Sequence, residues 1–165
     1  MIATEMFLNE LNEEAVTTRK FIADVPMDKA EWQPHPKCLT LKALATHIAE
    51  LPIWITYALT TEELDFATNH HQPAAVNSLP ELQELFETSL ANGRSHLTPD
   101  NESKMNDPWT LRSGDTVYST MTKAETIRRI FNQIIHHRAQ LAIYFHMLNI
   151  PVPPTYGTRA DYAGA

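Results

Sequence analysis

The feature that most constrains this fold is the helical spacing of apolar residues along almost the whole chain, combined with very few glycines. Only four glycines occur among 165 residues. Apolar side chains at steps of three and four form a stripe along one side of a helix. We therefore expect an all-α fold in one domain over residues 1–165, because a chain of this length can bury a core without cross-links. The single cysteine leaves no internal disulfide to assist it.

Start and stop signals predict four helices. The expected ranges are residues 4–23, 40–59, 79–97 and 122–148. Thr40, Ser78 and Thr122 are the expected N-caps of the last three, and a glutamate three residues after Ser78 and Thr122 completes a capping box. Pro52 falls inside the second helix and should kink it one turn after His47.

The connections between these helices are long. Residues 61–77 are polar and predict a surface crossover, in which the adjacent His70 and His71 are expected to be solvated. Residues 109–112 and 116–119 alternate around a Ser-Gly-Asp turn, which predicts a short β-hairpin before the last helix. The sequence thus favours a four-helix bundle with long crossover connections.

Charge and hydropathy exclude some classes of partner. The formal net charge is −7 and no basic cluster occurs, which argues against nucleic acid or an anionic membrane as the main partner. No apolar run approaches the length of a membrane span, and the first residues lack the features of a signal peptide. We therefore expect a cytoplasmic protein.

Two histidines on the apolar sides of different helices are the main candidates for chemistry. His47 lies among the apolar residues of the second helix, and His137 lies on the apolar side of the last. Gln133 precedes His137 by four residues, so both share one helix face and could converge with His47 on a metal ion. A neutral glutamine oxygen is a weaker ligand than imidazole, and water could fill that position instead. A histidine on an apolar face is also commonly a core residue, so this reading stays open.

The neighbouring polar and aromatic residues suggest less. His136 lies about 100° around the helix from His137 and is expected at the rim or hydrogen-bonded behind the site. Glu50 could act as a base one turn after His47, although a helix-surface ion partner is the simpler reading. The three tryptophans are expected to be core and loop anchors and not the walls of a ligand site; they are Trp32, Trp54 and Trp109.

Four segments, in this order and spacing, resemble the DinB/YfiT-like family of small helical bundle proteins. They are residues 32–36 (WQPHP), 44–48 (LATHI), 132–140 (NQIIHHRAQ) and 150–157 (IPVPPTYG). The resemblance implies a divalent metal, nickel or zinc, held by three histidines, one from the second helix and two from the last. His47 and His137 match the first and third of these, whereas Gln133 stands at the second. This chain therefore departs from the family pattern at one ligand.

The resemblance also implies a class of reaction. Some family members are similar to thiol-dependent transferases, in which the metal activates a low-molecular-weight thiol, and many are homodimers. Our leading hypothesis is a metal-dependent enzyme of the thiol-transferase or hydrolase type that acts on a small molecule. The alternative is a non-catalytic, stress-associated binding or scaffold bundle with a degraded metal site. Either way, the second and last helices should pack side by side and bring His47 and His137 to a shared cleft.

Overall fold

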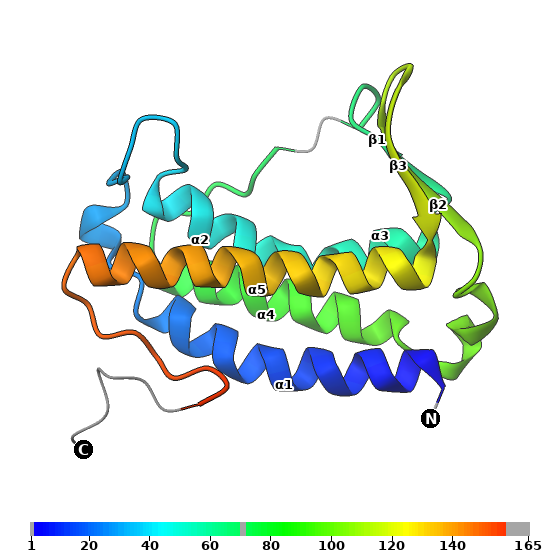
Figure 1. Ribbon diagram of the computed structural model, residues 1–165, viewed down its shortest axis with the longest axis horizontal. Coiled ribbons are helices and arrows are strands. Elements are labelled where there is room, and N and C mark those ends of the chain that lie inside the picture. Colours follow the sequence, from blue (N-terminus) through cyan, green and yellow to red (C-terminus); the bar gives the residue numbers. More distant parts are fainter. Residues whose placement is uncertain (1, 70–71, 158–165) are drawn as a thin grey trace.

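The structure is a computed structural model that describes residues 2–69 and 72–157. The helices are α1 (Ala3–Ala23), α2 (Leu41–Glu50), α3 (Trp54–Thr60), α4 (Leu79–His96) and α5 (Lys123–Met147) (Figure 1). Three short 3-10 helices are η1 (Met27–Lys29), η2 (Leu51–Ile53) and η3 (Pro99–Lys104). The strands are β1 (Glu63–Asp65), β2 (Pro108–Ser113) and β3 (Thr116–Thr122). His70 and His71 lie outside the described residues.

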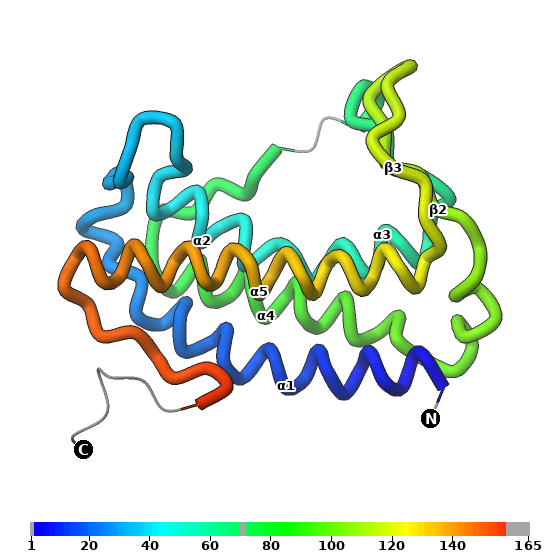
Figure 2. Tube along the Cα trace, in the orientation of Figure 1, coloured from blue at the N-terminus to red at the C-terminus, as the bar shows by residue number. Residues whose placement is uncertain are grey.

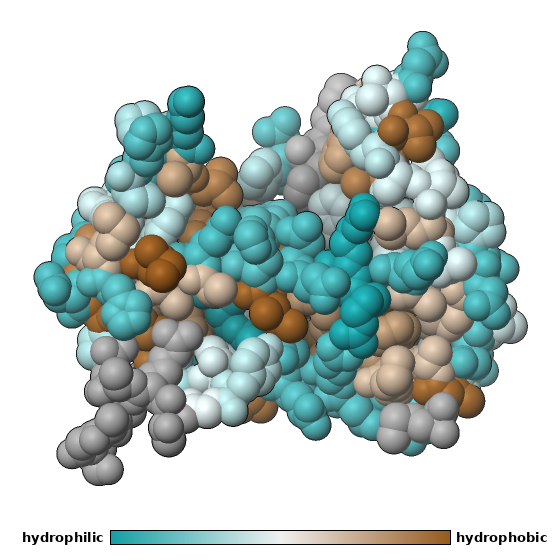
Figure 3. Space-filling model, viewed as in Figure 1, coloured by the Kyte–Doolittle hydropathy of each residue, from teal (hydrophilic) through white to brown (hydrophobic). Residues whose placement is uncertain are grey.

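The long helices lie side by side along one axis of the molecule. The α2–α3 segment runs beside α5, with α4 behind them and α1 along the opposite edge (Figures 1 and 2). The loop before α2 and the β2–β3 hairpin project from the same side of this helical layer, and the surface between them is hollowed (Figure 3). No helix within the described ranges combines the length and the apolar character that a bilayer crossing needs.

Proline breaks the second predicted helix into two. The helix stops at Glu50, a 3-10 turn contains Pro52, and α3 continues from Trp54. The expected kink one turn after His47 is confirmed as a full break. Gly93 of α4 packs against this turn, and a Cβ atom built at Gly93 would lie 2.6 Å from the carbonyl oxygen of Pro52. Only glycine therefore lets α4 approach so closely.

The predicted caps are present at three helix starts. The hydroxyl of Thr40 accepts from the amide of Ala43, and the hydroxyl of Ser78 accepts from the amide of Glu81. The Glu81 carboxylate accepts from the amide of Asn77 instead of that of Ser78, so the capping box predicted at Ser78 is only half formed. Thr122 forms a complete capping box, because its side chain accepts from the amide of Glu125 while the Glu125 carboxylate accepts from the Thr122 amide. These local bonds begin α2, α4 and α5 within a residue of the predicted positions.

A three-stranded sheet corrects the expected all-α class. The predicted β2–β3 hairpin is present, and β1 adds a parallel strand at its edge, in the order β1-β2-β3. Asp65 holds this arrangement, since its carboxylate accepts from the amides of Ala67 and Gly114 and pairs with Arg112. The two amide donors, with Arg112, keep the pKa of the Asp65 carboxyl below its ordinary value. The fold is therefore mostly helical with a small sheet, and its five helices replace the expected four.

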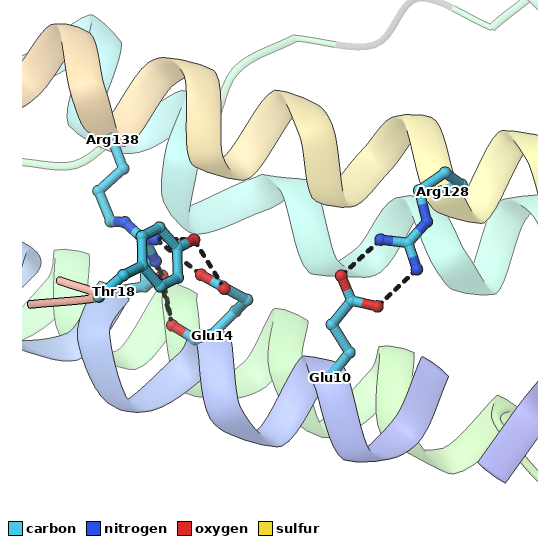
Figure 4. Close-up of polar contacts among 6 residues, drawn as sticks. Glu10, Glu14, Thr18, Arg128 and Arg138 are labelled. Atoms are coloured by element: carbon cyan, nitrogen blue, oxygen red, sulfur yellow. Dashed lines mark hydrogen bonds and ion pairs between the residues drawn. The ribbon is translucent and has the colours of Figure 1, made fainter. Parts of the chain in front are cut away.

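Apolar and ionic contacts join α1 to α5. Phe7 stacks on Phe131 at a centroid separation of 6.0 Å, and Phe21 stacks on Phe145 at 5.9 Å. The same two helices are joined by a bidentate pair between Arg128 and Glu10 (Figure 4).

A second ion pair between these helices is buried. Arg138 is 2% exposed, and it contacts the Glu14 carboxylate at 2.7 Å and the Thr18 hydroxyl at 3.1 Å (Figure 4). The hydroxyl of Tyr156 accepts from Arg138 and donates to Glu14, which fastens the segment after α5 to both helices. Burial, followed by the Glu14 hydrogen bond, raises the pKa of Tyr156. The buried cation is thus paired with the Glu14 carboxylate, and the exposed Tyr156 bonds to both from the surface.

Candidate functional site

The structure places His47 of α2 against His137 of α5. The two imidazole rings lie 4.6 Å apart between centroids and cross at 79°. Both side chains are half-buried. The expected proximity of these two histidines is confirmed, and its cause is the packing of α2 alongside α5.

A glutamine side chain orients the rings of His137 and His136. The Nδ1 atom of His137 lies 2.8 Å from Oε1 of Gln140, and Nε2 of Gln140 lies 3.1 Å from Nε2 of His136. An amide oxygen only accepts, so with this orientation of Gln140 the neutral form of His137 donates from Nδ1 and has its acceptor at Nε2. His136 is exposed and its ring centroid lies 5.1 Å from that of His137. It therefore stands behind His137, as its helical position predicted.

Gln133 lines the same pocket as His47. A cavity of about 250 Å³ opens beside the histidines, and both His47 and Gln133 line it. Gln133 itself is exposed. The structure thus brings the three predicted site residues close together. The imidazoles of His47 and His137 are in contact, and Gln133 lines the same pocket as His47. Whether they bind a metal stays a prediction.

The pocket is mostly apolar and lies under the small sheet. Its walls come from three parts of the fold: His47, Leu51 and Trp54 from the α2–α3 segment; Trp109, Leu111, Ser119 and Met121 from the sheet; and Thr126, Arg129, Ile130 and Gln133 from α5. The tryptophans pack as predicted, since Trp109 is buried and both Trp32 and Trp54 pack against the core. Trp54 and Trp109 also line the pocket. Trp32 is an anchor as predicted, since it packs edge-on against Tyr144.

Hydrogen bonds to Thr61 hold the sheet over the helices. The indole nitrogen of Trp109 donates to the Thr61 hydroxyl at 3.0 Å. The ammonium of Lys123, which is 1% exposed, donates to the Thr61 carbonyl at 2.7 Å. One residue after α3 thus receives bonds from β2 and from the first turn of α5, which fixes the three walls of the pocket relative to one another.

Glu50 has a structural position that neither expectation described. Its side chain is buried, and Oε1 accepts a 2.7 Å hydrogen bond from the amide of Ala74 in the crossover between β1 and α4. This carboxylate therefore fastens the crossover to α2. The Glu50 side chain is buried and does not line the pocket.

The donor set fits a divalent ion incompletely. Within the described residues, no cluster of three or more His, Cys, Asp or Glu side chains could hold a metal. His47 and His137 supply two imidazoles, which suit zinc and nickel, and their separation is compatible with nitrogens at about 2.0–2.1 Å from one ion. The third nearby donor is the neutral amide of Gln133. The candidate donors are therefore two imidazoles and one neutral amide.

Several residues of the site could not be singled out from the sequence. Arg129 and Met121 reach the pocket only because the hairpin folds over α5. Gln140 could have been found, since it lies three residues after His137 and four after His136, which places it beside both on a helix. The sheet residues carried no comparable local signal.

Comparison with known proteins shows the family and the fold that this chain resembles. The profile of the DinB family matches residues 1–164. A DinB-like protein from Bacillus subtilis superposes with a TM-score of 0.70 and 14% sequence identity, over 93% of this chain and 99% of that one. A DinB-like protein from Bacillus cereus gives 0.71 and 16%, over 92% and 97% of the two chains.

A third structure, from Exiguobacterium sibiricum, has a TM-score of 0.67 and 17% identity, over 98% of both chains. At these identities the structural likeness concerns the fold alone. No curated protein matches the sequence. The match of the family profile along almost the entire length shows that this chain belongs to the DinB family.

Proposed function

We propose that this DinB-family protein is a metal-dependent enzyme of the thiol-transferase or hydrolase type, with nickel or zinc bound by His47 and His137. The observation that carries the proposal is the contact between the two rings at the end of an apolar pocket. Gln133 completes or borders the site. A bound divalent ion supplies Lewis acidity, which lowers the pKa of a thiol or a water molecule so that a nucleophile forms at neutral pH.

The residues of the chain have separate tasks in this proposal. Gln140 holds His137 in the tautomer whose Nε2 atom can act as a ligand. Trp54 and Trp109 shield one side of the pocket from water and present flat apolar surfaces to a small substrate. A low-molecular-weight thiol would then be the co-substrate of a transferase.

The finer assignments of architecture and assembly are also proposals. We regard α2, the Pro52 turn and α3 as one broken arm, which makes the helical part a four-helix bundle. We propose a cytoplasmic homodimer, and the exposed Ile143 and Met147 support this because they lie four residues apart on one face of α5. Light scattering of the purified protein measures its oligomeric state, and a monomeric mass would contradict the dimer.

An activity screen tests the proposed enzyme. Protein made without a histidine tag is loaded with zinc or nickel and incubated with monochlorobimane and a panel of low-molecular-weight thiols, or with p-nitrophenyl acetate. Turnover should require the metal, stop in chelator, and fall at least tenfold in His137→Ala. Equal rates with the parent, the chelated protein and His137→Ala would rule out the enzyme.

One observation favours a second candidate function, a non-catalytic binding bundle with a degraded metal site. Gln133 stands where the family pattern has an imidazole, and the described residues contain no set of three strong ligands. Metal content separates the two candidates. Protein isolated without bound nickel or zinc, and unable to take up either ion, would favour the degraded site.

A further inference from the structure

The pocket beside His47 carries one cation and no acid. Arg129 lies on its wall, and none of the lining residues is an aspartate or a glutamate. The whole chain has a formal charge of −7, with 20 acidic residues against 13 lysines and arginines. A pocket whose described lining includes an exposed arginine and no acidic residue is therefore a local exception in an acidic protein.

Helix geometry directs Arg129 toward the pocket. Thr126, Arg129, Ile130 and Gln133 are spaced at three and four residues, so they form one stripe of α5, and His137 continues that stripe one turn later. Arg129 and His137 thus lie along the same side of α5, and His47 of α2 packs against His137. A ligand in the pocket can contact Arg129 with one end and point its other end toward His47.

The bonding of Arg129 differs from that of its neighbours. Arg128 is paired with Glu10, Arg112 with Asp65, and Arg138 with Glu14. For Arg129, the described part of the chain provides one hydrogen bond, from Nη1 to the hydroxyl of Ser119 at 3.2 Å, and no ion pair. That bond to β3 positions the guanidinium at the pocket without neutralising its charge. Its other N–H groups remain suited to a planar anion.

We infer that the pocket binds small carboxylates with an apolar body, and that Arg129 is the residue that recognises the carboxylate. This inference rests on the proposed function in one respect: it takes the carboxylate to be the substrate of the proposed enzyme. The apolar body lies among Trp54, Trp109 and Leu111, and the carboxylate accepts hydrogen bonds from Arg129 at the rim. Arg129 determines specificity and lies just over two turns of α5 before His137.

The test compares two compounds that differ only in charge. Hydrocinnamate and hydrocinnamamide share a phenyl body, and only the first carries a carboxylate. Binding is measured by fluorescence, since two of the three tryptophans line the pocket. A chelator is present throughout, so that a bound metal cannot recognise the carboxylate in place of Arg129. The parent should bind hydrocinnamate about tenfold more tightly, which corresponds to about 1.4 kcal/mol.

Three variants locate the preference. Arg129→Met keeps an apolar stem and removes the charge, so both compounds should bind with equal affinity. Arg129→Lys should restore part of the preference. Arg19→Ala is the matched control, because Arg19 is an exposed arginine that pairs with Glu87 and does not line the pocket. It should retain the full preference, and circular dichroism verifies that each variant is folded.

Each contrary result overturns the inference. It fails if the parent binds neither compound, if the parent does not prefer the carboxylate, or if Arg129→Met keeps the tenfold preference. Zinc titration of the same proteins without chelator tests the proposed function separately. A parent that prefers hydrocinnamate through Arg129 but takes up no metal would refute the metal enzyme and leave the carboxylate site standing. A parent that binds zinc but does not prefer hydrocinnamate would support the metal centre and refute the carboxylate site.

Discussion

His47 of α2 and His137 of α5, 90 residues apart in the sequence, meet with their ring centroids 4.6 Å apart. A ring contact at 79° is also a stable arrangement for two neutral imidazoles in a core. The geometry therefore permits both a metal site and a simple packing contact, which differ in whether the two histidines bind an ion. Metal binding by substituted proteins distinguishes these two alternatives.

Replacement of Gln133 with histidine should tighten metal binding. Gln133 shares the pocket wall with His47, and histidine has a similar reach, so Gln133→His adds a third imidazole without repacking the helix. A ligand that binds only the folded state raises the free energy of unfolding by RT ln(1 + [L]/Kd), so zinc should also raise the melting temperature more than in the parent. Titration calorimetry and thermal melts measure the two effects.

Two controls accompany this variant. The added stability should vanish in chelator and in the double variant that also carries His47→Ala. Zinc affinity no higher than that of the parent would show that position 133 does not face the site, and His136 would become the candidate for the second imidazole.

Gly93→Ala should destabilise the fold by about 1–3 kcal/mol, the usual cost of overpacking. The new methyl group would lie 2.6 Å from the backbone oxygen of Pro52, which cannot rotate away. Gly157→Ala is the matched control, since a Cβ atom there has nothing within 4 Å. Urea denaturation compares the two variants, and equal midpoints for both would contradict the close approach of α4 to the Pro52 turn.

Arg138→Ala should cost about 3–5 kcal/mol, because it leaves the Glu14 carboxylate in the core without its cation. Tyr156→Phe removes one hydrogen-bonding hydroxyl and should cost about 1 kcal/mol. Arg19→Ala breaks an exposed pair and should cost less than about 1 kcal/mol. Chemical denaturation should rank the losses in unfolding free energy in this order. An Arg138→Ala variant as stable as the parent would show that the buried ion pair does not stabilise the fold.

The Asp65 carboxylate should make stability depend on pH. Its pKa is lowered in the folded protein, chiefly by the amides of Gly114 and Ala67, so folding favours the ionised form. The contribution is fully present above the ordinary value of 3.8 and is lost as the pH falls through the lower folded-state value. Asp65→Asn should be less stable than the parent at neutral pH, and the difference should shrink in acid. Urea denaturation of both proteins at neutral pH and in acid measures this difference in unfolding free energy. A difference that does not change with pH would contradict the prediction.

Local signals predicted the helices, while tertiary contacts decided the sheet and the pocket. Thr40, Ser78 and Thr122 are caps whose bonds lie within three residues, so they could be found from the sequence. The break at Pro52 follows from the ring of that residue. The three-residue strand β1 has no comparable signal, because it forms only where β2 and the Asp65–Gly114 contact meet it.

The same distinction applies to the site. His47 and His137 could be paired because each lies on the apolar side of its own helix. That Trp54 and Trp109 also line a pocket could not be predicted, because an aromatic residue in a pocket wall has the same local pattern as one in the core. Arg129 has no distinguishing sequence context beside Arg128; only the fold shows that one pairs with Glu10 and the other faces the pocket.

The most direct test of the account is the metal content of the protein purified without a histidine tag, together with His47→Ala and His137→Ala prepared in parallel. Elemental analysis of the parent after incubation with zinc or nickel and gel filtration should find about one ion per chain, and either substitution should remove most of it. A parent that retains no metal, or alanine variants that retain as much as the parent, would contradict the claim that these two histidines form a metal centre.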